Sequence, residues 1–343
     1  MRHPRFARLL VAATALSLVL GACARQGGSS TAPATTGPSG SAAAGGSTEP
    51  STGAKPGVGK TVNIAVNPWV GYEADAAVIG YLLEHELGYK VEKKNLAEQV
   101  SWEGFPTGVV DVILENWGHD DLKKKYIDTD KTAQSAGELG VTGIIGWYVP
   151  AWMKTDHPDI DNWESLNKYA DLFKTSESGG KGQLLDGDPS YVTNDVALVK
   201  NLKLNYEVVV GGTEAALITS FQTATTQKKP LLAYFYDPQW AWSQPPLSDQ
   251  PLVRVKLPEY TAGCDAKPEA VACDYPPYIL DKIVSTKFAT DGGAAFTLVK
   301  NFKWSNLDQS TVSELIANKG MTPEEAGQKW VEDNPDKWKA WMP

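Results

Sequence analysis

Four large aromatic side chains stand where predicted β-strands end. They are Trp69, Trp117, Trp152 and Tyr236. The loops after the strands of an open α/β sheet are where such proteins bind ligands. Aromatic faces carry negative electrostatic potential, so several rings around one point favour a dispersed cation such as trimethylammonium. Any one ring could instead pack in a core, but four at strand ends together indicate an aromatic cage.

Polar side chains near these rings could hold the other end of such a solute. The candidates are Glu115, Asn116, His119, Ser190, Thr193 and Asn194. The segment 186–194 ends one predicted strand and opens a helix, where free backbone N–H groups could bind a carboxylate or a hydroxyl. Each has a structural alternative: Glu115 could pair with a lysine or face solvent, His119 could merely start a helix, and 186–194 could be a helix cap.

The sequence lacks the motifs of common hydrolases. It contains no Gly-x-Ser-x-Gly, no His-Glu-x-x-His and no glycine-rich phosphate loop. The histidines at 85, 119 and 157 lack metal-ligand spacing. We therefore expect a binding protein without enzymatic activity, metal or cofactor. A glycosidase or a secreted sugar-binding protein is the alternative from another class, because paired carboxylates cannot be excluded from sequence.

The N-terminal residues indicate export. Three arginines within the first eight residues precede an apolar run over 9–20, which is too short for a membrane span. The run ends in Leu-Gly-Ala-Cys, which matches the lipobox of bacterial lipoproteins. We therefore expect a signal peptide over 1–22, lipidation of Cys23, and a flexible Gly/Ser/Thr/Pro-rich linker over 23–60.

The charge and the cysteines agree with an extracytoplasmic protein. The net charge is −9, and removal of the arginine-bearing signal peptide makes it more negative. Nucleic acid and anionic membrane surfaces are therefore poor partners. Cys264 and Cys273 are the other two cysteines, and outside the cytoplasm such a close pair is expected to form a disulfide.

The chain from Thr61 onward reads as alternating strands and helices, which is typical of parallel α/β proteins. It is about 280 residues long, above the size at which single cores usually stop growing, so two lobes are expected. The first set of elements comprises strands 61–66, 90–95 and 109–114 and helices 74–87, 102–107 and 120–127. The second comprises strands 144–149, 182–186, 206–210 and 230–236 and helices 163–173, 194–202 and 213–226, with Thr213 as an N-cap. Helices of an all-helical C-terminal run are expected to start at Pro276, Asp308 and Thr322.

From about 61 to 343 the sequence resembles the glycine betaine, proline betaine and choline binding proteins of ABC importers. Three segments carry the resemblance: Val-Ile-Leu-Glu-Asn-Trp at 112–117, the Tyr-Phe-Tyr and Asp-Pro segment at 231–238, and Gly-Met-Thr-Pro-Glu-Glu-Ala at 320–326 with Trp330. The resemblance implies an α/β, two-lobed, periplasmic-binding-protein-like fold of type II, with a hinge and a ligand cleft. It implies a first lobe of 61–145 plus 246–343 and a second of 146–245.

The same resemblance assigns the cage to the four aromatic residues above. The sequence departs from the family at two points. The last cage position is Tyr236 where the family often has Trp, with Trp240 and Trp242 nearby as substitutes. Glu115 replaces the glycine that is common before the Asn-Trp pair.

The expected function is that of a solute-binding lipoprotein of an ABC importer. It is expected to be a monomer, anchored outside the cytoplasm through Cys23, and to pass its solute to a membrane permease. Hinge closure would trap a quaternary-ammonium compound: glycine betaine first, then choline, carnitine and proline betaine. A binder of the same fold for a non-quaternary polar solute is the nearer alternative.

Overall fold

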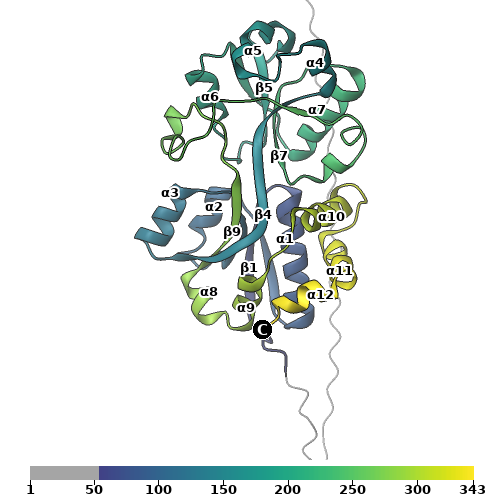
Figure 1. Cartoon of the computed structure of the whole chain (residues 1–343). Coiled ribbons are helices and arrows are strands. Elements are labelled where there is room, and N and C mark those ends of the chain that lie inside the picture. The colour runs from purple at the N-terminus through teal and green to yellow at the C-terminus, as the bar shows by residue number, and fades with distance from the viewer. Residues whose placement is uncertain (1–53) are drawn as a thin grey trace, which may run out of the picture. The chain divides into compact units, whose positions relative to one another are not determined.

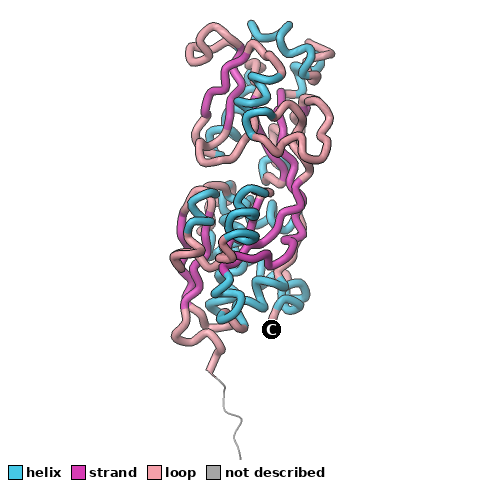
Figure 2. The backbone as a smooth tube through the Cα atoms, turned by 90° about the vertical axis from the view of Figure 1, so that its left-hand side faces the viewer, coloured by secondary structure: helices cyan, strands magenta, loops and turns pink. Residues whose placement is uncertain are grey.

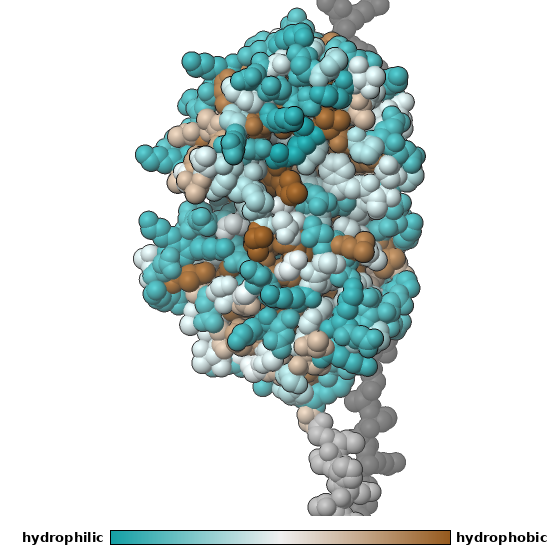
Figure 3. Space-filling view, in the orientation of Figure 1, coloured by the Kyte–Doolittle hydropathy of each residue, from teal (hydrophilic) through white to brown (hydrophobic). Residues whose placement is uncertain are grey.

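A computed structural model of the chain describes residues 54–343. The predicted signal peptide, Cys23 and the linker up to residue 53 lie outside the described residues. Within 54–343, none of the helices combines the length and apolar character needed to cross a membrane. Figure 3 shows that hydrophilic side chains cover most of one face of this part, as expected for a protein whose apolar residues form a core.

The first lobe begins with parallel strands and intervening helices (Figure 1). Its first elements are β1 (Thr61–Val66), α1 (Val70–Tyr81), β2 (Lys90–Asn95), α2 (Glu98–Glu103), β3 (Val112–Asn116) and α3 (Asp120–Leu122). A π-helical turn extends α1 over Leu82–Glu86, and another extends α3 over Lys123–Thr129. Nearly every residue of α1 is buried, because the sheet covers one side and C-terminal helices cover the other.

One long strand, β4 (Ala133–Val149), belongs to both lobes (Figures 1 and 2). Its first part pairs antiparallel with β9 (Tyr278–Ser285), and its last part pairs antiparallel with β7 (Ala233–Asp237). The strand order is therefore β2-β1-β3-β9-β4-β7-β5-β6. Gly140 lets β4 bend, because its φ is +93° and a Cβ there would lie 2.6 Å from the carbonyl oxygen of Trp304.

The second lobe repeats the strand–helix pattern around β7. Its elements are α4 (Ala151–Asp156), α5 (Trp163–Tyr169), β5 (Gly182–Asp186), α6 (Asp195–Asn201), β6 (Tyr206–Val210), α7 (Glu214–Gln227) and the short β8 (Val253–Arg254). The Thr213 hydroxyl accepts the Ala216 N–H, so the predicted N-cap of α7 is confirmed. The two-lobed α/β class predicted from sequence is also confirmed.

The stretch after β7 stays with the second lobe further than the predicted boundary at residue 246. β8 pairs with the end of β4, and Arg254 makes an ion pair with Asp274 in which two guanidinium nitrogens contact both carboxylate oxygens. The predicted disulfide between Cys264 and Cys273 is present within this stretch. We therefore place the return to the first lobe at β9, because that is where pairing with the first sheet resumes.

The C-terminal part contains a strand where a helix was predicted. A helix starting at Pro276 is wrong: residues 278–285 form β9, a mostly buried strand inserted between β3 and β4. The sequence Tyr-Ile-Leu-Asp-Lys-Ile-Val-Ser carries β-branched residues that suit such a central position. The Lys282 ammonium group on β9 is fully buried and donates to the carbonyl oxygens of Lys300 and Phe302, and burial lowers its pKa to about 7.

Helices complete the first lobe after β9. They are α8 (Thr286–Asp291), α9 (Ala294–Asn301), α10 (Asn306–Ala317), α11 (Pro323–Asp333) and α12 (Pro335–Trp338). Thr322 caps α11 in a reciprocal capping box with Glu325, as the predicted start requires, whereas α10 is capped by Ser305 three residues before the predicted Asp308. Gly327 lets α11 approach α1 closely, since a Cβ there would lie 2.5 Å from the Ala77 carbonyl oxygen.

Candidate functional site

A cavity of about 390 Å³, counted with its open mouth, lies where the two lobes meet. The first lobe lines it with Trp69, Glu98, Trp117 and His119. The second lobe contributes Tyr191, Val192, Tyr234 and Tyr236, and the two crossing strands contribute Ile145 and Tyr278. Six of the ten lining residues are therefore Trp or Tyr, drawn from both halves of the fold.

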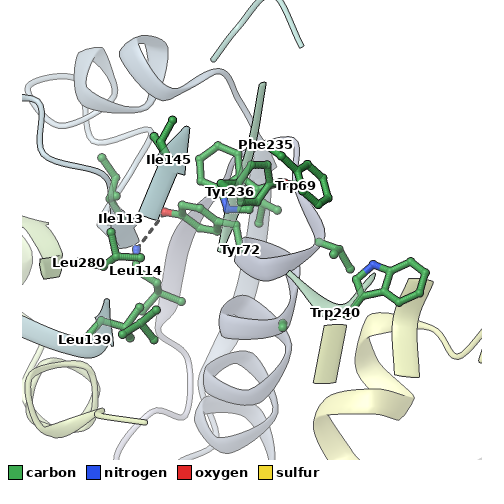
Figure 4. Close-up of a cluster of buried hydrophobic side chains, with 14 of the residues drawn as sticks. Trp69, Tyr72, Ile113, Leu114, Leu139, Ile145, Phe235, Tyr236, Trp240 and Leu280 are labelled. Atoms are coloured by element: carbon green, nitrogen blue, oxygen red, sulfur yellow. Dashed lines mark hydrogen bonds between the residues drawn. The ribbon is translucent and has the colours of Figure 1, made fainter. Parts of the chain in front are cut away.

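The rings of the cavity contact one another across the lobes. Trp117 and Tyr236 have centroids 5.9 Å apart with ring planes at 78°, and Trp69 and Tyr191 are 5.7 Å apart at 83°. Tyr278 lies 5.8 Å from Trp117. Edge-to-face contacts of this kind hold neighbouring rings at steep angles, so they form the walls of a box. Figure 4 shows Trp69 beside Tyr236 at the upper end of α1.

Glu115 fixes the two tryptophans of the first lobe. The indole N–H groups of Trp69 and Trp117 both donate to its Oε1, at 2.9 and 2.6 Å, and the Gln309 amide donates to its Oε2 at 2.6 Å. The side chain lies behind the two indoles and does not line the cavity. Glu115 thus orients the cage and does not touch a solute in this geometry.

A second buried carboxyl group, Asp75 on α1, lies beside Glu115. Burial and the neighbouring Glu115 raise the pKa of Asp75 well above its usual range. Burial also raises the pKa of Glu115, but its hydrogen bonds with Asp75, the two indoles and Gln309 oppose that change. Burial and repulsion thus favour the neutral form of Asp75, whereas three hydrogen-bond donors favour the charged form of Glu115, which lies directly behind the tryptophan edges.

Tyr236 is held in a comparable way in the second lobe. Its hydroxyl donates to Oε1 of Glu214 at 2.5 Å, and the Gln239 amide donates to the same oxygen at 2.5 Å. Burial and Glu214 raise the pKa of Tyr236 well above its usual range, so the phenol remains a neutral donor. Burial raises the pKa of Glu214, and its hydrogen bonds with Tyr236, the Val70 N–H and Gln239 oppose that change. A buried acidic side chain therefore supports the cage in each lobe, Glu115 in the first and Glu214 in the second.

His119 and Glu98 form the polar end of the cavity. His119 precedes α3 in a left-handed conformation, with φ at 52°, and its Nε2 contacts Oε2 of Glu98 on α2. Both side chains are about nine-tenths buried. None of the ten lining residues is Lys or Arg. A solute in the cage therefore meets an acid paired with a histidine, together with the tyrosine hydroxyls.

Other candidates from the sequence lie outside the cavity. The Trp152 indole donates to the Ala224 carbonyl oxygen at 3.0 Å, so this ring packs on α7 and is not brought to the cage. The Asn116 amide donates to Asp281 and to the Gly118 carbonyl oxygen, which shapes the loop that carries Trp117. The prediction of Trp152 as a cage residue is not supported by this geometry.

The polar residues of 186–194 act as local structure. Ser190 donates to Asp188, the Thr193 hydroxyl donates to Asp186, and the Asn194 backbone N–H donates to the Tyr275 hydroxyl. These contacts fix the loop that leads into α6, although Asn194 makes no side-chain cap of this helix. The loop nevertheless reaches the cavity, through Tyr191 and Val192.

The two tryptophans proposed as substitutes for Tyr236 do not line the cavity. The Trp242 indole donates to the Tyr236 carbonyl oxygen at 3.0 Å and its ring packs on Phe235. Trp240 is buried and lies apart from the Trp69 and Tyr236 rings, next to a C-terminal helix (Figure 4).

Four lining residues with polar groups were not predicted from sequence: Glu98, Tyr191, Tyr234 and Tyr278. Tyr234 could have been found, because it precedes Tyr236 by two residues and must point to the same face of the strand. Tyr278 begins β9, where the sequence predicts a helix. Glu98 follows the end of β2 by three residues, but it starts a short helix, where an acidic residue is common without any ligand.

Two α/β lobes joined by crossing strands, with a ring-lined cavity between them, are the architecture of a solute-binding protein. The family model for the substrate binding domain of ABC-type glycine betaine transport systems matches residues 60–333, and the chain belongs to this family. It is therefore a binding protein and not an enzyme, which removes the glycosidase alternative.

Relatives and solved structures agree with this assignment. The trimethylamine N-oxide-binding protein of Pelagibacter ubique (strain HTCC1062) is 25% identical over 284 residues, covering 77% of this chain and 84% of the relative. A glycine betaine/carnitine transport binding protein of Listeria monocytogenes is 27% identical over 137 residues, 40% of this chain and 39% of that protein.

The fold matches that of an ABC-transporter choline binding protein in complex with choline, with a TM-score of 0.66, 20% identity, and coverage of 82% of this chain and 91% of that one. It also matches lactococcal OpuAC in its closed form with glycine betaine, with a TM-score of 0.61, 18% identity, and coverage of 83% and 100%.

Proposed function

We propose that this protein captures a small solute with a trimethylammonium group in the cavity between its lobes and presents it to a membrane permease. The observation that carries the proposal is the convergence of tryptophan and tyrosine rings from both lobes on one cavity, with a buried carboxylate behind each half. A quaternary nitrogen has no N–H to satisfy, so rings can replace water around it. Each desolvated ring contributes about 0.5–2 kcal/mol.

Association and lobe closure offset much of this attraction, so we expect micromolar affinity, about −8 kcal/mol. Closure would occur about β4 and β9, the two strands that cross between the lobes. The solute bridges the two halves of the cage and so favours the closed form by contacts that the open form lacks. The closed form is what the permease would recognise.

The polar lining favours a hydroxyl over a carboxylate at the other end of the solute. Glu98 can accept a hydroxyl proton, whereas a solute carboxylate would meet this acid with only His119 and tyrosine hydroxyls as donors. We therefore propose choline ahead of glycine betaine, which reverses the order expected from the sequence. Carnitine and proline betaine come after glycine betaine in the proposed order, because they carry a carboxylate as it does and are larger.

Isothermal titration calorimetry tests the proposal. The solutes are choline, glycine betaine, carnitine, proline betaine, trimethylamine N-oxide, the uncharged choline isostere 3,3-dimethylbutan-1-ol, and glucose. We expect binding of trimethylammonium compounds, weak or no binding of the isostere, and none of glucose. Trp117→Ala should weaken binding at least tenfold, whereas Trp338→Ala, on α12 outside the cavity, should not. Equal binding of choline and its isostere would contradict the cage, and tighter binding of glycine betaine than choline would contradict the order.

We also propose that the protein is anchored outside the cytoplasm through a lipid on Cys23. Support comes from the sequence alone: the apolar run, the Leu-Gly-Ala-Cys motif and the polar linker that follows. Mass spectrometry of the mature protein should find a diacylated N-terminal cysteine, and Cys23→Ser should release the protein from membranes. A mature protein that begins at another residue would contradict the anchor.

A further inference from the structure

A hydrogen bond crosses between the lobes beside the cavity. Val70 is the first residue of α1 in the first lobe, and its backbone N–H donates to Oε2 of Glu214 at 2.9 Å. Glu214 is the first residue of α7 in the second lobe. The residue before α1, Trp69, provides no side-chain cap, so a carboxylate from the opposite lobe occupies the N-terminal end of this helix. A negative charge is favourable at that end because of the helix dipole.

Glu214 is held in place by its own lobe. Its other oxygen accepts the Tyr236 hydroxyl and the Gln239 amide, and the residue is only 9% exposed. These partners lie on or directly after β7, which packs in the same lobe as α7. Opening of the lobes would therefore leave Glu214 where it is and break only its bond to Val70.

The loop that precedes α1 in the first lobe makes a second contact between the lobes. The Tyr191 hydroxyl donates to the Pro68 carbonyl oxygen at 3.2 Å, and the Tyr191 ring packs on Trp69. Tyr191 also lines the cavity, whereas neither Glu214 nor Val70 does. The contact between Glu214 and Val70 can therefore act on closure without touching the solute.

We infer that Glu214 and the Val70 N–H form an interlobe latch, which stabilises the closed form whether or not a solute is bound. The inference rests on the closure step of the proposed function, but not on the identity of the solute. A charge-assisted hydrogen bond to a helix N-terminus that is exchanged for water on opening should shift the ratio of closed to open forms about tenfold. In binding kinetics, the latch should slow solute dissociation and leave association nearly unchanged, because it forms after the solute has entered.

Two substitutions remove the latch from opposite sides. Glu214→Gln keeps an oxygen for Tyr236 and Gln239 but turns an NH₂ group toward the Val70 N–H. Val70→Pro removes the donor and keeps the Glu214 charge. Proline is well accepted at the first position of a helix, and the extended Trp69 backbone, with φ −142° and ψ 152°, is compatible with a following proline. The exposed Glu164, near the start of α5 in the second lobe, allows the matched control Glu164→Gln.

The closed fraction is measured without solute by single-molecule energy transfer between dyes at the exposed residues Lys124 and Glu177, one in each lobe. Both latch variants should lower the ratio of closed to open forms about tenfold, and the double variant should lower it no further. Stopped-flow measurements with choline should find about tenfold faster dissociation in Val70→Pro, which keeps Glu214 behind the cage, and association within twofold of the wild-type rate. Glu164→Gln should match the wild type in both.

Thermal unfolding separates the latch from general damage, since the latch variants should keep a single cooperative transition. An unchanged closed ratio and dissociation rate in folded Val70→Pro would overturn the latch, as would fully additive effects in the double variant. Failure of every trimethylammonium compound to bind the wild type would overturn the proposed function instead, and the energy-transfer experiment without solute would still decide on the latch.

Discussion

Replacing Glu115 by glutamine removes the charge behind the first-lobe tryptophans and keeps the shape of the site. The new side-chain oxygen can still accept both indole N–H groups. The new NH₂ group would face the NH₂ group of Gln309. The Gln309 Oε1 has no hydrogen-bond partner in the protein, so rotation of the Gln309 amide lets this oxygen accept from the new NH₂ group. Glu115→Gln therefore tests the charge of the carboxylate separately from the position of the rings.

The magnitude follows from Coulomb's law. One hydrogen bond, part of an indole ring and one van der Waals contact separate the carboxylate from a cation in the cage. Together they place the cation about 7 Å from the carboxylate. With an effective dielectric constant of about 20, the attraction at that distance is about 2 kcal/mol. We expect Glu115→Gln to weaken binding of choline roughly 30-fold.

The assay compares choline with uncharged 3,3-dimethylbutan-1-ol by calorimetric titration. The variant should lose most of the preference for the cation, while weak binding of the uncharged isostere stays the same. Asp75→Asn is the matched control, because burial raises the pKa of Asp75 and we expect its replacement to change no charge. An unchanged preference in folded Glu115→Gln would refute the idea that this carboxylate acts on the solute. Equal losses in both variants would point to packing as the cause.

Three further predictions concern other parts of the molecule. Trp69→Ala should lower solute affinity at least tenfold, whereas Trp152→Ala should change it less than twofold, because its ring packs outside the cavity; equal effects in calorimetry would contradict this placement. Replacing both Cys264 and Cys273 by serine should lower the melting temperature by about 5 °C in calorimetric scans, because closing this short loop stabilises the fold by about 2–3 kcal/mol. An unchanged melting temperature would argue against stabilisation by the disulfide. The free energy of unfolding in urea, measured relative to Lys282→Met, should rise with pH between about 7 and 10. In that window the unfolded lysine binds a proton that the folded one lacks. A difference that stays constant with pH would contradict the lowered pKa.

The strand–helix alternation of the fold could be read from the sequence because each such element carries its own pattern. β1 alternates, α7 begins at a Thr cap, and α11 begins at a Thr-Pro pair that favours a helix start. β9 could not be placed, because a short apolar run preceded by prolines can be either a helix or a strand. Its neighbours in the sheet, β3 and β4, lie far away in sequence.

The candidate site was predictable where local pattern and position in the sheet coincide. Trp69, Trp117 and Tyr236 stand at strand ends, and the structure brings all three to the cavity. Trp152 follows β4 in the same way, but β4 continues past the cavity before it ends, so its end lies elsewhere. The role of Glu115 also depends on three-dimensional contacts, because two indoles 48 residues apart in sequence share one of its oxygen atoms.

The strand order has a consequence for how the chain folds. The second lobe is almost continuous in sequence, so its contacts can form as soon as that part of the chain is available. The first lobe cannot be completed until β9 is inserted between β3 and β4, and β9 follows the whole second lobe along the chain. Pairing over such sequence distances is slow. The lobe that emerges first therefore finishes last, and until then β3 presents an unpaired edge to which other chains could add.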